Sequence, residues 1–228
     1  MKILPLRRPP TVVVAGPRPA RDPGIAERWR AATEANPRLF DGPILAITAI
    51  DAASATLHAR LDRFAHLVCP RAAVVPVSIL SITGIIEAQA GRRPVVLAGR
   101  RGRSTRSYPG MWEFGPSGGL EAADDARVLG QPDLLRTLRR ELHEEVGIAH
   151  PLRDARVVGI VPDPGARSVD VLVRARLEGD PPPLRPPREH AWEYDEARWI
   201  PIADLPAFLD HEPVIGPMIA TARWLGWA

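Results

Sequence analysis

The 228-residue sequence predicts a protein of the α/β class with several strands. Between residues 132 and 146, Leu134, Leu138, Leu142 and Val146 recur at four-residue steps, the spacing of an amphipathic helix. Short segments rich in Val, Ile and Thr, bounded by Gly and Pro turns, predict the strands. Hydrophobic residues make up 45% and charged residues 25% of the chain, which is ordinary for a soluble globular protein.

Arginine dominates the basic residues, since Lys2 is the only lysine. Together with many Ala and 26 Pro, this composition is typical of a GC-rich genome. The net charge of +3 is small, and the pI of 9.7 mostly reflects arginine. We therefore expect no nucleic-acid partner.

Cys69 is the only cysteine, which excludes an internal disulfide and fits a reducing compartment. The N-terminus lacks the uninterrupted apolar core of a signal peptide. Residues 72–90 are apolar enough to test as a membrane span, but Pro76, Gly84 and Glu87 interrupt them. Their β-branched residues favour a buried strand. These features predict a cytoplasmic enzyme with no membrane partner.

The N-terminal extension, residues 1–70, predicts a small group of strands and helices. In chain order we expect a strand, a helix, a hairpin and a short helix, at residues 11–15, 25–36, 44–50 with 55–59, and 61–68. A turn at residues 36–43 carries the apolar pair Leu39 and Phe40. We expect this extension to be a structural or dimerising addition, which allows a homodimer, with substrate selection as the alternative.

In the remaining chain, residues 71–228, alternating segments predict strands at 75–88, 94–100, 155–161 and 168–177. Residues 215–227 predict a C-terminal amphipathic helix that packs Trp224, with Trp227 as a further candidate.

A basic loop follows the second of these strands and contains Arg100, Arg101, Arg103 and Arg106. Arginine makes forked hydrogen bonds to phosphate oxygens. Arg100 and Arg101 are the candidates for substrate binding because they lie nearest the strand end. The alternative is a solvated loop with no ligand.

A glycine turn at residues 113–119 is the next candidate, because Gly118 and Gly119 allow backbone to approach a ligand closely.

Glu141, Glu144 and Glu145 are spaced so that they share one flank of the predicted helix. They lie in its last two turns, where the helix dipole disfavours negative charge. Gly147 then suits the left-handed position that ends a helix. A solvated acidic face is one explanation. The other is a hard divalent cation with oxygen ligands, Mg²⁺ or Mn²⁺.

The order of these residues resembles the Nudix box, G-x5-E-x7-R-E-U-x-E-E-x-G-U, in which U is aliphatic. Residues 140–148 agree with its second half at every specified position. In the first half, Gly118 can be the leading glycine, but Asp124 stands where the family has Glu. The loop before Arg140 is eight residues longer than the pattern requires. The resemblance extends loosely over residues 73–209.

Membership of this family implies an α/β/α sandwich with a mixed sheet over residues 71–228. It implies hydrolysis of a nucleoside diphosphate linked to another group, X, by attack of water on the diphosphate bridge. By resemblance, the cation ligands are Glu141, Glu144 and Glu145, with Glu121 in support.

Arg140 is expected to orient a glutamate through an ion pair, and Glu145 to hold the central ion. The general base is expected to be Glu121 or Glu196, the latter in a segment, residues 191–201, that resembles a late strand of the family. Glu193 in the same segment is an equal candidate.

The identity of X stays open. A lengthened loop inside the box and the turn at residues 36–42 resemble the UDP-glucose and UDP-galactose hydrolysing branch, although the intact Arg140 departs from it. Pro162, fifteen residues after Gly147, resembles a mark of the ADP-ribose branch.

Other functions on this fold are weighed against hydrolysis. An isopentenyl diphosphate isomerase needs an active-site cysteine, and Cys69 precedes the core. A non-catalytic nucleotide sensor would explain Asp124 and the long loop, but sensors usually lose the glutamates. A transcriptional regulator would need a winged-helix module. The sequence therefore predicts an enzyme that binds a small nucleotide.

Overall fold

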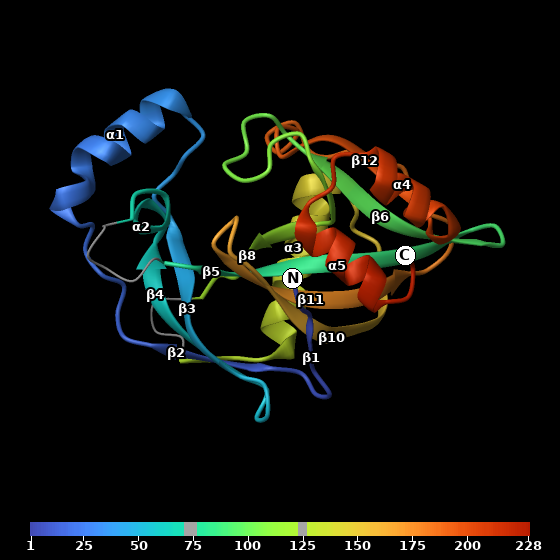
Figure 1. Ribbon diagram of the computed structural model, residues 1–228, viewed down its shortest axis with the longest axis horizontal. Helices are drawn as coiled ribbons and strands as arrows, with labels where there is room; N and C mark the ends of the chain where they lie inside the picture. Colours follow the sequence, from blue (N-terminus) through green and yellow to red (C-terminus); the bar gives the residue numbers. More distant parts are fainter. Residues whose placement is uncertain (71–76, 123–126) are drawn as a thin grey trace.

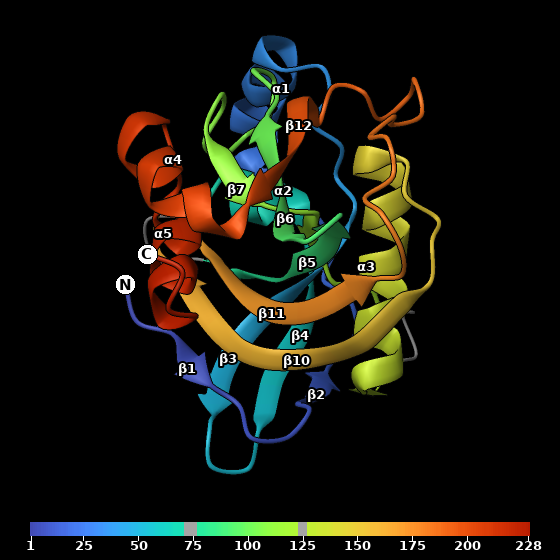
Figure 2. The same cartoon turned by 90° about the vertical axis from the view of Figure 1, so that its right-hand side faces the viewer.

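The structure, a computed structural model, describes residues 1–70, 77–122 and 127–228. Among these residues, twelve strands form one mixed sheet, with helices on both of its faces (Figures 1 and 2). This arrangement confirms the predicted α/β class and the mixed sheet. Asp124, the departure from the box pattern, lies outside the described residues.

The sheet has a main path and a side branch. The main path runs β1 (Leu4–Pro5), β10 (Leu152–Asp163), β11 (Ser168–Leu177), β5 (Ile79–Ala90), β3 (Pro43–Asp51), β4 (Thr56–Arg63), β2 (Thr11–Ala15) and β9 (Val128–Leu129). The branch consists of β6 (Arg93–Arg101), β7 (Trp112–Phe114), β8 (Ser117–Gly119) and β12 (Tyr194–Pro201). β5 pairs with strands of both parts and so lies at the centre of the fold.

Helices cover the two faces of β5 and β11 separately. α3 (Gln131–Val146) lies on one side, and α4 (Leu205–His211) and α5 (Gly216–Trp224) lie on the other (Figure 2). Side chains alternate along β5, so Leu80 and Ile82 join the apolar cluster of α3, whereas Ile85 joins the cluster of α5. The sheet therefore separates two apolar cores.

Local signals explain where α3 begins and ends. The amide of Gly130 donates to Asp133 Oδ2 at 2.9 Å, and Pro132 occupies the first turn. At the other end Gly147 has a φ of 74°, and Ile148 donates to the Leu142 carbonyl at 3.0 Å. The predicted helix is confirmed at both ends.

The N-terminal extension also contains a short turn of helix, η1 (Pro23–Ile25), and the helices α1 (Ala26–Ala35) and α2 (Phe64–Val68) (Figure 1). Its strands continue the large sheet. Ala46 of β3 pairs with Ile79 of β5, and Val12 of β2 pairs with Leu129 of β9. The extension is thus joined to the core through backbone hydrogen bonds, while a domain boundary near residue 70 stays a prediction.

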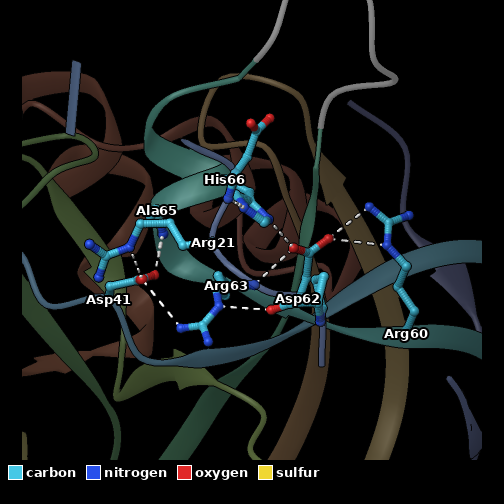
Figure 3. A network of polar contacts seen from close by, with 9 residues as sticks. Arg21, Asp41, Arg60, Asp62, Arg63, Ala65 and His66 are labelled. Atoms are coloured by element: carbon cyan, nitrogen blue, oxygen red, sulfur yellow. Dashed lines mark hydrogen bonds and ion pairs between the residues drawn. The ribbon is translucent and has the colours of Figure 1, made fainter. Parts of the chain in front are cut away.

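A polar network holds the turn at residues 36–42 against α2 (Figure 3). Asp41 accepts hydrogen bonds from the Ala65 amide at 3.0 Å and from Arg21 at 2.8 Å. Asp62 is 2% exposed, and it accepts from Arg60 at 2.7 Å and contacts His66 Nδ1 at 2.7 Å. Every charge in this network has a partner, so it fixes the position of the turn.

The C-terminal part differs from the sequence expectation in two respects. Trp224 is 39% exposed, so the prediction that it packs in the core is wrong. The buried residues of α5 are Pro217, Met218, Thr221 and Ala222, and Trp227 beyond it packs edge-on against Phe114. The helix η2 (Ile202–Asp204), with α4 after it, was not predicted.

No helix of the described part of the chain is long and apolar enough to cross a membrane.

Candidate active site

The backbone of the glycine turn packs directly against side chains at the end of α3, because the turn has no side chain at Gly118. A methyl group at Gly118 would collide with the Glu141 carboxyl group. Ser117, one residue earlier, donates its amide to Glu145 Oε2 at 3.0 Å. Two of the three predicted glutamates therefore lie directly behind β8.

Glu141 and Glu145 are buried, at 6% and 3% exposure. Burial raises the pKa of Glu141 to about 8, which the nearby Arg140 only partly offsets, and repulsion by Glu144 adds to it. Burial also raises the pKa of Glu145 well above its ordinary value, and the negative charge of Glu141 raises it further. Two adjacent carboxyl groups thus lack enough positive charge to stay ionised.

Arg140 is the cation nearest these acids. Its guanidinium contacts Glu141 at 2.7 Å, Glu144 at 2.9 Å and Glu121 at 3.4 Å. The ion pair expected of Arg140 is therefore present. Glu121 itself is 65% exposed in its side chain, and its role stays a prediction.

The candidate ligands are carboxylates, whose oxygen atoms are the ligands that hard divalent cations prefer. The raised pKa values of Glu141 and Glu145 show that nearby cations do not fully balance their charge. As the side chains stand, no three acids, histidines or cysteines of the described residues gather closely enough to hold a metal ion. Glu144 faces Arg140 and Glu145 faces the Ser117 amide. Binding a cation therefore requires these side chains to move closer together than they stand.

A cavity of about 390 Å³ opens beside this cluster. Of the predicted site residues, Arg101, Gly118, Gly119, Glu145 and Glu193 line it. The N-terminal extension forms part of the wall through Asn36, Arg38, Leu39, Phe40, Phe64 and Leu67.

Arg100 and Glu196 lie elsewhere. They belong to the paired strands β6 and β12 and contact each other at 3.2 Å. Neither is among the residues that line the cavity. Their predicted roles in substrate binding and base catalysis therefore gain no support from the geometry.

Glu113 is a site residue that the sequence did not single out. It is 5% exposed, and its Oε1 accepts from Arg101 at 2.6 Å, Ser117 Oγ at 2.8 Å and the Tyr194 hydroxyl at 3.0 Å. The sequence signal is an acid between the apolar Trp112 and Phe114, in a strand that ends at the glycine turn. Glu113 links β6, β7, β8 and β12.

The cavity electrostatics follow from this network. Burial alone would lower the pKa of Arg101, but Glu113, Tyr194 and Glu145 together outweigh it and raise that pKa. Burial and Glu113 raise the pKa of Tyr194 well above its ordinary value. Arg101 therefore remains a cation, and Tyr194 remains a neutral hydrogen-bond donor.

A second acid that the sequence did not single out is Asp170 on β11, which also lines the cavity. Burial raises its pKa to about 7, although the neighbouring Ser168 hydroxyl lowers it in part. Nothing in the local sequence distinguishes Asp170 from a solvent-facing residue of an alternating strand.

Comparison with known proteins supports the motif. A family model described as NUDIX domain matches residues 79–222, which is more than half of the chain. A search of curated protein sequences with this chain found no match.

Solved structures of similar fold are distant in sequence. The NUDIX domain of Shewanella oneidensis NrtR, complexed with ADP ribose, is 17% identical, with 69% of this chain and 92% of that chain covered and a TM-score of 0.49. A NUDIX hydrolase from Alicyclobacillus acidocaldarius is 20% identical, with 63% and 89% covered and a TM-score of 0.46. A MutT protein from Methanosarcina mazei Go1 is 18% identical, with 63% and 88% covered and a TM-score of 0.45.

Proposed function

Because the chain belongs to the Nudix family, we propose that it is a pyrophosphohydrolase that cleaves a nucleoside diphosphate linked to a second group, X. One observation carries this proposal. Glu145 lines a cavity large enough for a nucleotide, and the buried Glu141 beside it lies against Gly118 of the glycine turn.

We assign Glu141, Glu144 and Glu145 as ligands of Mg²⁺ or Mn²⁺. Divalent cations are general in this family, and such an ion supplies positive charge against the diphosphate and makes water a better nucleophile. Arg140 positions Glu141 and Glu144 through its two ion pairs. Glu121 is a candidate for support because it reaches the same guanidinium.

For the general base we favour Glu193 over Glu196 and Glu121. Glu193 lines the cavity, and His190 Nδ1 contacts its carboxylate at 2.9 Å. A base must come within hydrogen-bond reach of the attacking water, directly or through one further water. Glu113 lies closer to the centre, but three donors already occupy the same oxygen atom.

For phosphate binding we favour Arg101 over Arg100. Arg101 lines the cavity and is held rigidly by Glu113 and by the Ser107 carbonyl at 2.8 Å. A prepositioned guanidinium loses little entropy when it binds an anion. Gly118 and Gly119 complete this end by allowing the diphosphate to approach the backbone.

The test is a phosphate-release screen with Mg²⁺ over UDP-glucose, ADP-ribose, NADH, diadenosine polyphosphates, CoA and nucleoside triphosphates. We expect hydrolysis of at least one diphosphate derivative and its loss in Glu145→Gln. The matched control is Glu178→Gln, because Glu178 is exposed and pairs with Arg153 on the distant β10. A wild-type protein that hydrolyses nothing would contradict the proposal.

A nucleotide sensor is the second candidate. The observation that favours it is the arrangement of Glu144, whose carboxylate already has a cationic partner in Arg140 at 2.9 Å. A sensor binds nucleotide tightly by calorimetry and releases no product with any cation. We also propose a cytoplasmic location and retain a homodimer as an expectation, to be tested by fractionation and by light scattering.

A further inference from the structure

The floor of the cavity is formed by the sheet itself. Leu80 and Ile82 of β5 face α3, so the alternating residues Ser81 and Thr83 face the other side and line the cavity. β5 lies between β8 and β11 in this region. The register of these strands therefore determines which side chains lie next to each other on the floor.

The paired residues form three successive rows across the floor. Starting beside the glycine turn, the rows contain Ser117, Thr83 and Leu172; then Gly119, Ser81 and Asp170; then Ile79 and Ser168. Residues two apart on a strand are separated by roughly 7 Å, so the rows lie about 7 Å and about 13 Å from the first.

The rows differ in chemistry. The first adjoins Glu145, which accepts the Ser117 amide, and it therefore belongs to the proposed hydrolytic centre. The second presents a hydroxyl and a carboxyl group from Ser81 and Asp170. The third continues through Ile79 into the apolar side chains of the N-terminal extension, among them Phe64.

Phe40 stands at this apolar end and is 78% exposed, although it lines the cavity. A large apolar ring that faces solvent at a cavity mouth is a surface available to a planar ligand. Arg38 lies over the Trp192 ring at 4.9 Å on the neighbouring wall.

The order along the floor is thus an anion-handling row, a hydrogen-bonding row and an apolar end. A nucleotide has the same order of parts: a diphosphate, a ribose and a planar base. We propose that Asp170 and Ser81 bind the hydroxyl groups of the nucleoside ribose, so that the substrate class is ribonucleoside diphosphate derivatives rather than 2′-deoxyribonucleoside derivatives. This inference rests on the proposed function for the position of the diphosphate.

The state of Asp170 in the free protein supports this assignment. Its carboxyl group faces the cavity, where burial and the charges of Glu113 and Asp163 raise its pKa to about 7. Two ribose hydroxyls would donate to the carboxylate and relieve the lost hydration. A third phosphate at this row would instead meet a like charge.

The test compares nucleotide pairs that differ only in the 2′-hydroxyl group. We expect the wild type to prefer UDP-glucose over its 2′-deoxyuridine analogue, and ADP-ribose over its 2′-deoxyadenosine analogue, by about 10- to 100-fold in kcat/KM. Asp170→Ala should reduce this ratio to within about threefold of unity, with Asp170→Asn between the two. Asp154→Asn, an exposed acid on β10, is the matched control and should leave the ratio unchanged.

A binding measurement separates this inference from the proposed hydrolysis. Calorimetry with UDP against dUDP, and with ADP against dADP, needs no turnover. A ribose preference that is lost in Asp170→Ala, in a protein without activity, would support the subsite and refute hydrolysis. If Asp170→Ala instead weakened the binding of the ribonucleotide and the deoxyribonucleotide equally, the subsite would be overturned and hydrolysis would stay intact. Absence of binding by all four nucleotides would overturn both.

Discussion

The protein buries carboxyl groups in two regions and treats them in opposite ways. In the N-terminal network, Asp41 is buried, yet the Ala65 amide and the Arg21 guanidinium outweigh the effect of burial and hold its pKa below the ordinary value. At the end of α3, burial raises the pKa values of Glu141 and Glu145, and neighbouring acids raise them further. Arg140 offsets this in part for Glu141, and the Ser117 amide does so in part for Glu145.

This difference distinguishes a structural network from a binding site. A carboxylate whose lone pairs are filled by amides and guanidinium groups stabilises the fold and has no need of a ligand. A buried carboxylate pair that lacks positive charge destabilises the free protein and favours whatever cation can enter. Strained electrostatics of this kind are typical of functional sites.

The largest effect is expected from Glu145→Gln, which removes a proposed cation ligand. Hydrolysis should fall by about 10³-fold, because a ligated cation contributes several kcal/mol to transition-state stabilisation. The same variant should be more stable than the wild type at pH 8 without divalent cations, because folding no longer has to bury or protonate this carboxyl group. Kinetics and thermal unfolding measure the two effects. If Glu145→Gln lost activity and were also less stable than the wild type without divalent cations, the glutamate pair would be a structural network like that of Asp41.

The pH dependence of stability sharpens the comparison next. The pKa of Glu141 is 4.5 ordinarily and about 8 in the folded chain, so the folded state binds its proton more tightly. The contribution of Glu141 to the free energy of unfolding is therefore fully present below about pH 4.5 and is lost as pH rises toward about 8. Asp41 does not oppose this change, because its pKa lies below 3.8.

We expect Tm in EDTA to fall progressively between pH 5 and pH 8. Added Mg²⁺ should reduce the fall, because cation binding displaces the proton and becomes tighter as pH rises. Differential scanning calorimetry at fixed ionic strength checks both statements. A Tm that is independent of pH, with and without Mg²⁺, would show that burial does not raise the pKa of Glu141 in the folded state.

Breaking the N-terminal network should have the opposite sign from breaking the glutamate pair. Asp41→Ala removes the acceptor of the Ala65 amide and of the Arg21 guanidinium, while Arg63 keeps its hydrogen bond to the Pro19 carbonyl. We expect a loss of about 1–3 kcal/mol in the free energy of unfolding. Asp41→Asn, which keeps an acceptor for the amide, should lose less. A stabilised Asp41→Ala protein would refute a structural role.

The sequence predicted the parts of the fold that depend on local signals. The helix from Pro132 to its end at Gly147 follows from apolar spacing and cap residues, and these act within one turn. The N-terminal hairpin follows from alternation. By contrast, the pairing of β2 with β9 and of β5 with β11 joins residues far apart in the chain, and no local pattern encodes a partner.

The candidate site shows the same division. The spacing of Glu141, Glu144 and Glu145 within one helix indicated their grouping, because helical geometry alone places them on one flank. Asp170 joins the cavity only through strand register, and the sequence gives it no mark. For Arg100 and Arg101, neighbours on an alternating strand, only the structure shows which one lines the cavity.

The smallest effect is expected from Phe40→Ala at the apolar end of the cavity. Because its ring is 78% exposed, truncation removes little burial, and the free energy of unfolding should change by less than about 0.5 kcal/mol. If the ring receives the base, KM should rise several-fold while kcat stays constant, since this contact is equal in ground and transition states. Val128→Ala, at a residue 60% exposed on the distant β9, is the matched control and should leave both constants unchanged. An unchanged KM in Phe40→Ala would show that the exposed ring does not receive the base.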